Sequence, residues 1–226
     1  MKNVTKIYRT LGGILLGLSL LQSTAQAENN IATLDWTTAE TLIALGEPPL
    51  AVGDVQSYQR WVAEPALPAQ TIDLGIRLQP NPEQIFQLKK QLQNPPHFIN
   101  SSFYAAVTPM LEKSAKVDLV DFYGEGNAWQ NVQQATEKVA RLIGKPDSAQ
   151  HLLQHYAQTI AELKPQAAPF TARPIILVQF IDTRHLRIYA QNSLLGAVLE
   201  QLGFQNAWQG SHNIWGFETI EVTKLA

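Results

Sequence analysis

Short strand-like segments and helical segments alternate along this chain, and that order limits the fold more than any other feature does. Residues 31–34 have the pattern of a strand. A capping-box pattern at Thr37 and Glu40 then begins a helix that Gly46 ends, and residues 50–53 predict a second strand. A strand, a helix and a strand within about 25 residues favour a parallel sheet. The sequence therefore predicts an α/β fold.

The middle of the chain continues this pattern. Residues 56–82 predict a loop-rich region, residues 82–93 a helix with proline in its first turn, and residues 97–100 a short strand. Residues 101–104 follow the end of that strand, which is where ligands bind in open α/β sheets. We therefore expect part of a binding site there.

Two long helices are predicted over residues 127–143 and 148–163, the second ended by Pro165. After a proline-rich break, residues 175–180 predict a buried strand, residues 186–189 its hairpin partner, and residues 194–202 a helix. This order predicts two α/β lobes joined by a long linking helix. We assign residues 28–145 to the N-terminal lobe, 146–168 to the linking helix and 169–226 to the C-terminal lobe.

The N-terminus predicts a secretory signal peptide over residues 1–27. Three basic residues precede an apolar stretch at 11–21, which is shorter than a membrane span needs. Ala25 and Ala27 form the small-x-small pattern for cleavage before Glu28. An uncleaved anchor or interfacial helix is the alternative. Because no cysteine is available for lipid attachment, the mature protein is expected to be soluble in the periplasm of a Gram-negative bacterium.

Composition excludes several classes of function. The 226 residues include no cysteine, which excludes disulfides, thiolate metal sites and a cysteine nucleophile. A net charge of -2 gives no reason to expect a nucleic-acid partner. The G-x-S-x-G, P-loop and G-x-G-x-x-G motifs are absent, so hydrolases and nucleotide-binding enzymes lack their usual signatures.

Histidines offer only a weak metal-site pattern. His151 and His155 are four residues apart on a predicted helix and could share a metal ion. The glutamate of the H-E-x-x-H motif is missing and no third ligand is evident, so we expect a surface helix face and no metal site. His185 and His212 are expected to face solvent in turn-like segments.

Aromatic residues outside helical core spacing are more informative. Trp36, Trp61, Tyr104 and Trp215 all fall near strand ends or in loops. Packing between the two lobes is one explanation for each of them. Together with Arg77, they predict a mostly apolar, aromatic-walled cleft with one cation, which is the chemistry of a ligand site.

Six segments, in the same order, resemble the periplasmic ferric hydroxamate-binding proteins of iron–siderophore ABC importers, and the resemblance extends over residues 30–226. The segments are residues 31–46 (IATLDWTTAETLIALG), 58–68 (YQRWVAEPALP), 72–81 (IDLGIRLQPN), 101–104 (SSFY), 172–195 (ARPIILVQFIDTRHLRIYAQNSLL) and 203–216 (GFQNAWQGSHNIWG). The fold is shared with cobalamin-, haem- and catecholate-binding relatives, so fold alone does not identify the ligand.

The resemblance implies the helical-backbone periplasmic binding protein fold, with a shallow cleft between the lobes and little closure on binding. Arg77 matches the arginine that reaches the iron-bound hydroxamate oxygens, and Tyr104 matches the tyrosine that hydrogen-bonds there. Trp61 and Trp215 match aromatics that line the two sides. Trp36 matches another tryptophan near the pocket.

The resemblance also implies the function. We expect a monomeric, non-enzymatic substrate-binding protein that captures a ferric siderophore and delivers it to an inner-membrane ABC permease for iron uptake. The iron(III)–siderophore chelate is the ligand, and we expect no cofactor and no metal ligand from the protein. Glu112 and Glu218 are candidate contacts for permease arginines, with an ordinary solvated surface as the alternative.

The charge of the predicted cleft favours a hydroxamate ligand. Three hydroxamates cancel the charge of Fe(III), so one arginine and one phenol satisfy the exposed oxygens. A ferric tris-catecholate carries about three negative charges and favours several arginines. Only Arg60, Arg77 and Arg187 are candidate cleft cations. The open alternatives are a catecholate, haem or cobalamin ligand, a siderophore-cleaving hydrolase, and a truncated, non-functional remnant.

Three features depart from the family pattern. Residues 89–96 make a longer turn than usual, so the placement of Tyr104 depends on register. Arg187 stands where an apolar contact is expected. Family members continue well beyond Ala226, so we expect an incomplete second lobe with an exposed sheet edge and unburied apolar surface.

Overall fold

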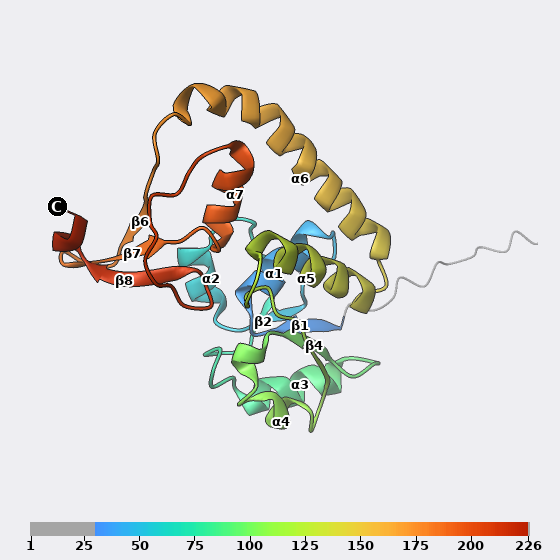
Figure 1. Cartoon of the computed structure of the whole chain (residues 1–226). Helices are drawn as coiled ribbons and strands as arrows, with labels where there is room; N and C mark the ends of the chain where they lie inside the picture. The colour runs from blue at the N-terminus through green and yellow to red at the C-terminus, as the bar shows by residue number, and fades with distance from the viewer. Residues whose placement is uncertain (1–29, 226) are drawn as a thin grey trace, which may run out of the picture.

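The computed structural model describes residues 30–225 and has two lobes (Figure 1), while the predicted signal peptide lies outside the described residues. The N-terminal lobe contains a sheet of five strands in the order β3-β2-β1-β4-β5, with every neighbouring pair parallel. The strands are β1 (Ile31–Thr33), β2 (Ala51–Val52), β3 (Ile72–Asp73), β4 (His97–Asn100) and β5 (Lys116–Leu119). The predicted α/β fold is therefore confirmed, although β5 was not expected.

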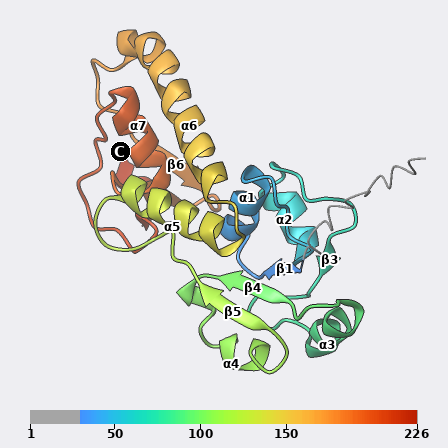
Figure 2. The same cartoon turned by 90° about the vertical axis from the view of Figure 1, so that its right-hand side faces the viewer.

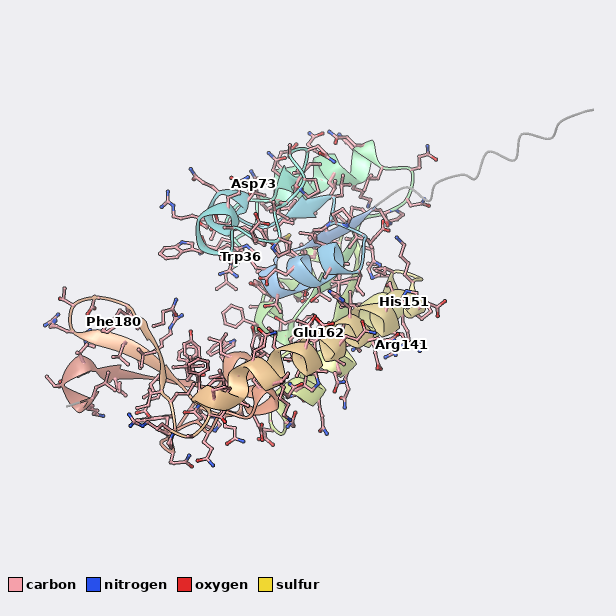
Figure 3. The ribbon with its side chains drawn as sticks, turned by 90° about the horizontal axis from the view of Figure 1, so that it is seen from above. Trp36, Asp73, Arg141, His151, Glu162 and Phe180 are labelled. Carbon is pink, nitrogen blue, oxygen red and sulfur yellow. The ribbon has the colours of Figure 1, made fainter. Side chains whose placement is uncertain are left out.

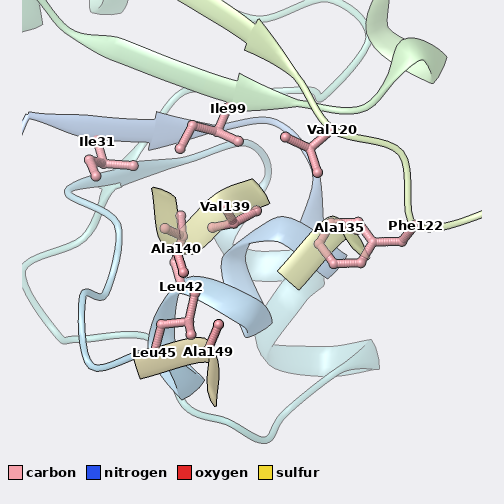
Figure 4. Packing of buried hydrophobic residues seen from close by; sticks show 10 residues of the cluster. All are labelled: Ile31, Leu42, Leu45, Ile99, Val120, Phe122, Ala135, Val139, Ala140 and Ala149. Atoms are coloured by element: carbon pink, nitrogen blue, oxygen red, sulfur yellow. The ribbon is translucent and has the colours of Figure 1, made fainter. Parts of the chain in front are cut away.

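Helices cover both faces of this sheet. Successive side chains of a strand point to opposite faces, so Ile31 and Ile99 lie on one face and Ala32 and Phe98 on the other. The first pair packs against α1 (Trp36–Ala44) and α5 (Ala128–Leu142), as Figure 4 shows. The second packs against α3 (Pro82–Gln91) and α4 (Thr108–Leu111). Burial on both faces explains why successive residues of β1, β2 and the middle of β4 are apolar.

Asp35, and not the predicted capping box, begins α1. Its Oδ1 accepts hydrogen bonds from the backbone N–H groups of Thr37 (2.9 Å) and Thr38 (3.4 Å). The prediction was wrong because Asp35 occupies the N-cap directly after β1, which leaves Thr37 inside the first turn. The N-cap is consequently two residues earlier than the sequence predicted.

The region expected to be mostly loop contains a helix, α2 (Val55–Trp61), capped by Asp54. Of the seven residues of α2, only Tyr58 is buried. The sequence therefore lacks the apolar periodicity that would predict this helix. Tyr58 is held in place because its hydroxyl donates to the Pro65 carbonyl at 2.7 Å. The loop-rich region predicted over residues 56–82 therefore contains part of a helix that was not expected.

A long helix, α6 (Pro146–Ala167), leads from the N-terminal to the C-terminal lobe and packs against α5 and α7 (Leu194–Leu202) (Figures 1 and 2). It continues through Pro165, where the sequence predicted its end. Proline removes only one backbone donor, and this loss falls in the last turn of a 22-residue helix. The helix is solvent-exposed for most of its length, with Ala149 as its buried residue.

The C-terminal lobe contains an antiparallel sheet of three strands, β6 (Leu177–Phe180), β7 (His185–Tyr189) and β8 (Phe217–Glu221), in that order. The predicted hairpin of β6 and β7 is confirmed. The prediction of a buried β6 was wrong, because this strand is at the sheet edge and Val178 and Phe180 are 37% and 65% exposed. The strand β8 was not predicted. Short 3-10 turns complete the chain: η1 (Ser102–Tyr104), η2 (Ala168–Phe170) and η3 (Val222–Leu225).

Apolar side chains are exposed on the C-terminal lobe, as the sequence led us to expect. They include Phe170, Ile176, Phe180, Ile181 and Ile214. Figure 3 shows Phe180 on this lobe and Trp36 on the other. Among the helices of residues 30–225, none has the length and apolar character needed to cross a membrane.

Candidate ligand-binding site between the lobes

An open cavity of about 350 Å³ lies between the two lobes. Its lining residues are Asp35, Thr37, Arg77, Ser101, Phe103, Tyr104, Tyr123, Arg187, Trp215 and Phe217. A second hollow of about 280 Å³ continues it along Tyr189 and Leu195 and shares three of its aromatic residues. Three of the five predicted site residues, Arg77, Tyr104 and Trp215, therefore meet in one cavity.

The topology of the parallel sheet brings the N-terminal-lobe side of the cavity together. Asp35 follows β1, Arg77 follows β3, Ser101 follows β4 and Tyr123 follows β5. Parallel strands end at the same edge, so residues more than eighty positions apart in the chain become neighbours there. This is the edge at which open α/β sheets bind ligands.

Arg77 is held by two contacts on this wall. Its Nη1 donates to the Tyr104 hydroxyl at 3.0 Å, and its guanidinium carbon lies 3.8 Å from the centre of the Trp36 ring. Trp36 is itself fixed, because its indole N–H donates to the Gly53 carbonyl at 2.9 Å. A guanidinium stacked on an indole and bonded to a phenol is preorganised, with further N–H donors left to bind a ligand.

Tyr104 accepts from Arg77, so its own proton is available to a second acceptor. Burial, together with the charge of Asp35, raises the pKa of Tyr104 to about 12, against the opposing effect of Arg77. Burial also raises the pKa of Tyr123. Both phenols thus stay protonated at neutral pH and can donate hydrogen bonds to an oxygen-rich ligand.

Asp35 supplies the carboxylate of the cavity, and its two oxygens are already engaged. Oδ1 caps α1, and Oδ2 accepts a short hydrogen bond from the Ser101 hydroxyl. This residue therefore stabilises the junction of β1, α1 and β4. Asp35 was not predicted as a lining residue, although its position directly after the first strand was the available signal.

Gly53 allows Arg77 to lie against the sheet edge. A Cβ at this position would be 3.0 Å from Arg77 Cγ and 3.1 Å from Leu34 Cδ2, closer than side chains normally approach. The absence of a side chain at Gly53, directly after β2, thus allows Arg77 its observed position. Nothing in the sequence distinguished this glycine from others in turns.

Aromatic rings form the C-terminal-lobe wall. Trp215 stacks on Phe217 with a centroid distance of 6.1 Å, and Phe217 meets Tyr189 edge-on at 5.8 Å. Trp215 also contacts Phe103 of the N-terminal lobe edge-on at 6.0 Å, so an aromatic pair spans the cleft. Of these rings, only Trp215 was predicted from the sequence. Alternation along β7 and β8 was the signal for Tyr189 and Phe217.

The two remaining predicted tryptophans lie differently. Trp36 supports Arg77 from behind and is not one of the residues lining the two hollows. Trp61, at the end of α2, is 75% exposed and also lies outside both linings. Arg77, Tyr104 and Trp215 therefore line the cavity, and Trp36 lies behind Arg77 and supports it.

The other polar candidates are outside the cavity. His151 (Figure 3) and His155 are exposed on α6, and the described residues contain no group of three or more side chains that could hold a metal ion. Glu112 is exposed after α4, and Glu218 accepts a hydrogen bond from Ser211. Arg60 is exposed on α2, so of the three candidate cleft cations only Arg77 and Arg187 line the cavity.

A protein family described as periplasmic binding protein matches residues 31–226. The chain belongs to this family. The iron(3+)-hydroxamate-binding protein FhuD of Escherichia coli is 32% identical over 216 residues, which span 96% of this chain and 71% of that protein. Family membership confirms the resemblance seen in the six segments and the fold of two lobes joined by a helix.

Solved structures agree with this fold. The siderophore-binding protein FhuD of Vibrio cholerae, determined with Fe3+–Desferal bound, superposes with a TM-score of 0.79 at 27% identity and covers 87% of this chain and 73% of its own. SirA of Staphylococcus aureus superposes with a TM-score of 0.62 at 22% identity, covering 86% and 69%. At this lower identity the match concerns the fold alone.

Proposed function

We propose that this protein binds a ferric hydroxamate siderophore in the periplasm and delivers it to an inner-membrane ABC permease for iron uptake. The observation that carries the proposal is the Arg77–Tyr104 pair at one wall of an aromatic cavity. The ferric hydroxamate-binding relatives of similar sequence and fold support it.

Chemistry explains why this pair suits such a ligand. In a ferric tris-hydroxamate the iron is saturated and the complex is neutral, so the protein needs to supply hydrogen-bond donors and no metal ligand. The free N–H groups of Arg77 and the hydroxyl proton of Tyr104 are such donors. Because burial keeps the pKa of Tyr104 near 12, this donor persists over the physiological pH range.

The aromatic rings suit the rest of the ligand. Siderophore backbones are bulky and variable, and Phe103, Trp215 and Phe217 offer apolar contact without directional demands. The ring of Trp61, 75% exposed on α2, is free to meet a part of the ligand that extends beyond the cavity. We propose that the protein acts as a monomer, is secreted by a cleavable signal, and carries out no covalent chemistry.

Tryptophan fluorescence titration with ferrichrome and ferrioxamine B tests this proposal. Ferric hydroxamates absorb light and quench nearby indoles, and Trp215 and Trp36 lie at the cavity and beneath its arginine. We expect saturable quenching at micromolar ligand. Arg77→Gln is expected to weaken binding by about tenfold or more, because it removes a charge-assisted donor.

Arg60→Gln is the matched control, since it removes the same charge from an exposed helix outside the cavity. We expect wild-type affinity for this variant. A folded wild-type protein that shows no quenching with either ligand contradicts the proposed function. Equal losses for the two variants would contradict the assigned role of Arg77.

A further inference from the structure

Arg187 lies on the cavity side of the C-terminal sheet. Side chains of β7 alternate, so Leu186 and Ile188 join the buried cluster with Ile220, while Arg187 and Tyr189 face the other way. An arginine thus stands among the aromatic rings of this wall. Burial of the apolar set fixes the register, so Arg187 cannot turn away without exposing Leu186 and Ile188.

The guanidinium of Arg187 is positioned but only partly satisfied. Its carbon lies 4.7 Å from the centre of the Phe217 ring, and its Nη1 donates to the neutral amide oxygen of Gln179 at 3.3 Å. Its Nε is buried without a hydrogen-bond partner. No ion pair of the described residues includes Arg187. A cation with unused donors and no counter-charge therefore faces the cavity.

The charge of the whole cavity is positive. Arg77 lines the opposite wall, and Asp35 is the one carboxylate among the ten lining residues. Asp35 already caps α1 and accepts from Ser101. The cavity lining thus contains two guanidinium groups and one carboxylate, and that carboxylate is already hydrogen-bonded within the protein. A neutral ligand leaves this excess unbalanced, whereas a ligand with an anionic group balances it.

We propose that Arg187 makes this site select ferric chelates by charge, favouring hydroxamate siderophores that carry a free carboxylate over neutral ones and neutral ones over cationic ones. This inference rests on the proposed function. A carboxylate would take the unused donors of a guanidinium that Phe217 and Gln179 already hold in place, so little side-chain entropy is lost on binding.

Three ferric complexes built on one chelator test the proposal. Ferrioxamine B carries a free ammonium, its N-acetyl derivative is neutral, and its N-succinyl derivative carries a carboxylate, while the iron-binding groups are identical. Calorimetric titration at low and high salt would give the three affinities. We expect the wild-type protein to bind the succinyl complex about tenfold more tightly than the ammonium complex, with a smaller ratio at high salt.

Arg187→Gln is expected to reduce that ratio to about threefold or less while leaving the neutral complex within about threefold of its wild-type affinity. Binding of the neutral complex also shows that the variant is folded. Arg184→Gln is the matched control, because it removes the same charge from the exposed turn of the same hairpin, and we expect the wild-type ratio.

Two results would overturn the inference. One is an unchanged ratio in Arg187→Gln, and the other is an equal loss for all three complexes, which would mean that Arg187 only supports packing. A wild-type protein that binds none of the three complexes instead refutes the proposed function, and this inference with it.

Discussion

Replacing Gly53 with alanine is a direct test of how the site holds its arginine. The added Cβ would be 3.0 Å from Arg77 Cγ and 3.1 Å from Leu34 Cδ2. The backbone torsion at Gly53 is one that any residue adopts, so the effect arises from these two contacts. Leu34 is fully buried and Arg77 lines the open cavity, so we expect Arg77 to shift by a few tenths of an ångström and Leu34 to shift by less.

The expected magnitude follows from the hydrogen bond that this movement stretches. Arg77 donates to Tyr104 at 3.0 Å, and a charge-assisted bond of this kind contributes about 1.5–3 kcal/mol. We expect the displaced Arg77 to lose about half of this free energy in its hydrogen bond to the ligand. That loss corresponds to three- to tenfold weaker binding, or about 0.7–1.4 kcal/mol. The lower chain entropy of alanine in the unfolded state offsets the crowding, so stability should change by less than about 1 kcal/mol.

The assay is ferrichrome titration of Gly53→Ala beside Gly124→Ala, with thermal unfolding of both variants. Gly124 is the control because a Cβ there meets its nearest atom, Asn131 Nδ2, at 3.9 Å, which is ordinary contact. We expect weaker binding only in Gly53→Ala, at nearly unchanged melting temperature. Wild-type affinity in Gly53→Ala would refute the reasoning that this glycine positions Arg77.

Two further predictions address the Tyr104 phenol and the half-buried carboxyl group of Glu40. Tyr104→Phe removes the donor proposed for the ligand and the acceptor of Arg77, so titration should give about tenfold weaker binding with little change in the melting curve; unchanged affinity would exclude the hydroxyl from binding. Burial, together with Asp35, raises the pKa of Glu40 to about 7. The folded state therefore holds this proton more tightly than the unfolded chain, and stability declines as pH rises from about 4.5 to 7. Urea unfolding at pH 5 and pH 8 should show that Glu40→Gln removes this decline, by about 1 kcal/mol after solvent screening, and equal pH dependence in both proteins would contradict it.

The parallel sheet was predictable because its chemistry is local. A buried strand and an apolar helix follow one another between Ile31 and Leu45, and each has a sequence signature, although the N-cap is Asp35 and not the predicted Thr37. The helix α2 was not predictable in this way, since it buries only Tyr58. Its stability depends on contacts with residues outside its own seven positions.

The residues of the candidate site likewise include some that the sequence predicted and some that only the structure reveals. Arg77, Tyr104 and Trp215 could be named from the sequence because family segments carry them. Gly53 and Phe103 could not, because their roles arise from distances across the fold: a missing Cβ beside Arg77, and a ring that meets Trp215 over the cleft. Trp36 was placed near the pocket by its motif, but only the structure gives its position under the guanidinium.

Along the described residues, the chain passes from one lobe to the other once, through α6. A helix of 22 residues is about 33 Å long and bends little. We therefore expect the spacing of the two walls to change little on ligand binding, so capture should follow single-phase kinetics with a rate linear in ligand concentration. The loaded and empty forms would also present nearly the same outline to a membrane transporter. Empty protein would then compete with loaded protein for the same docking position, so uptake would depend on the loaded fraction more than on the total amount of protein.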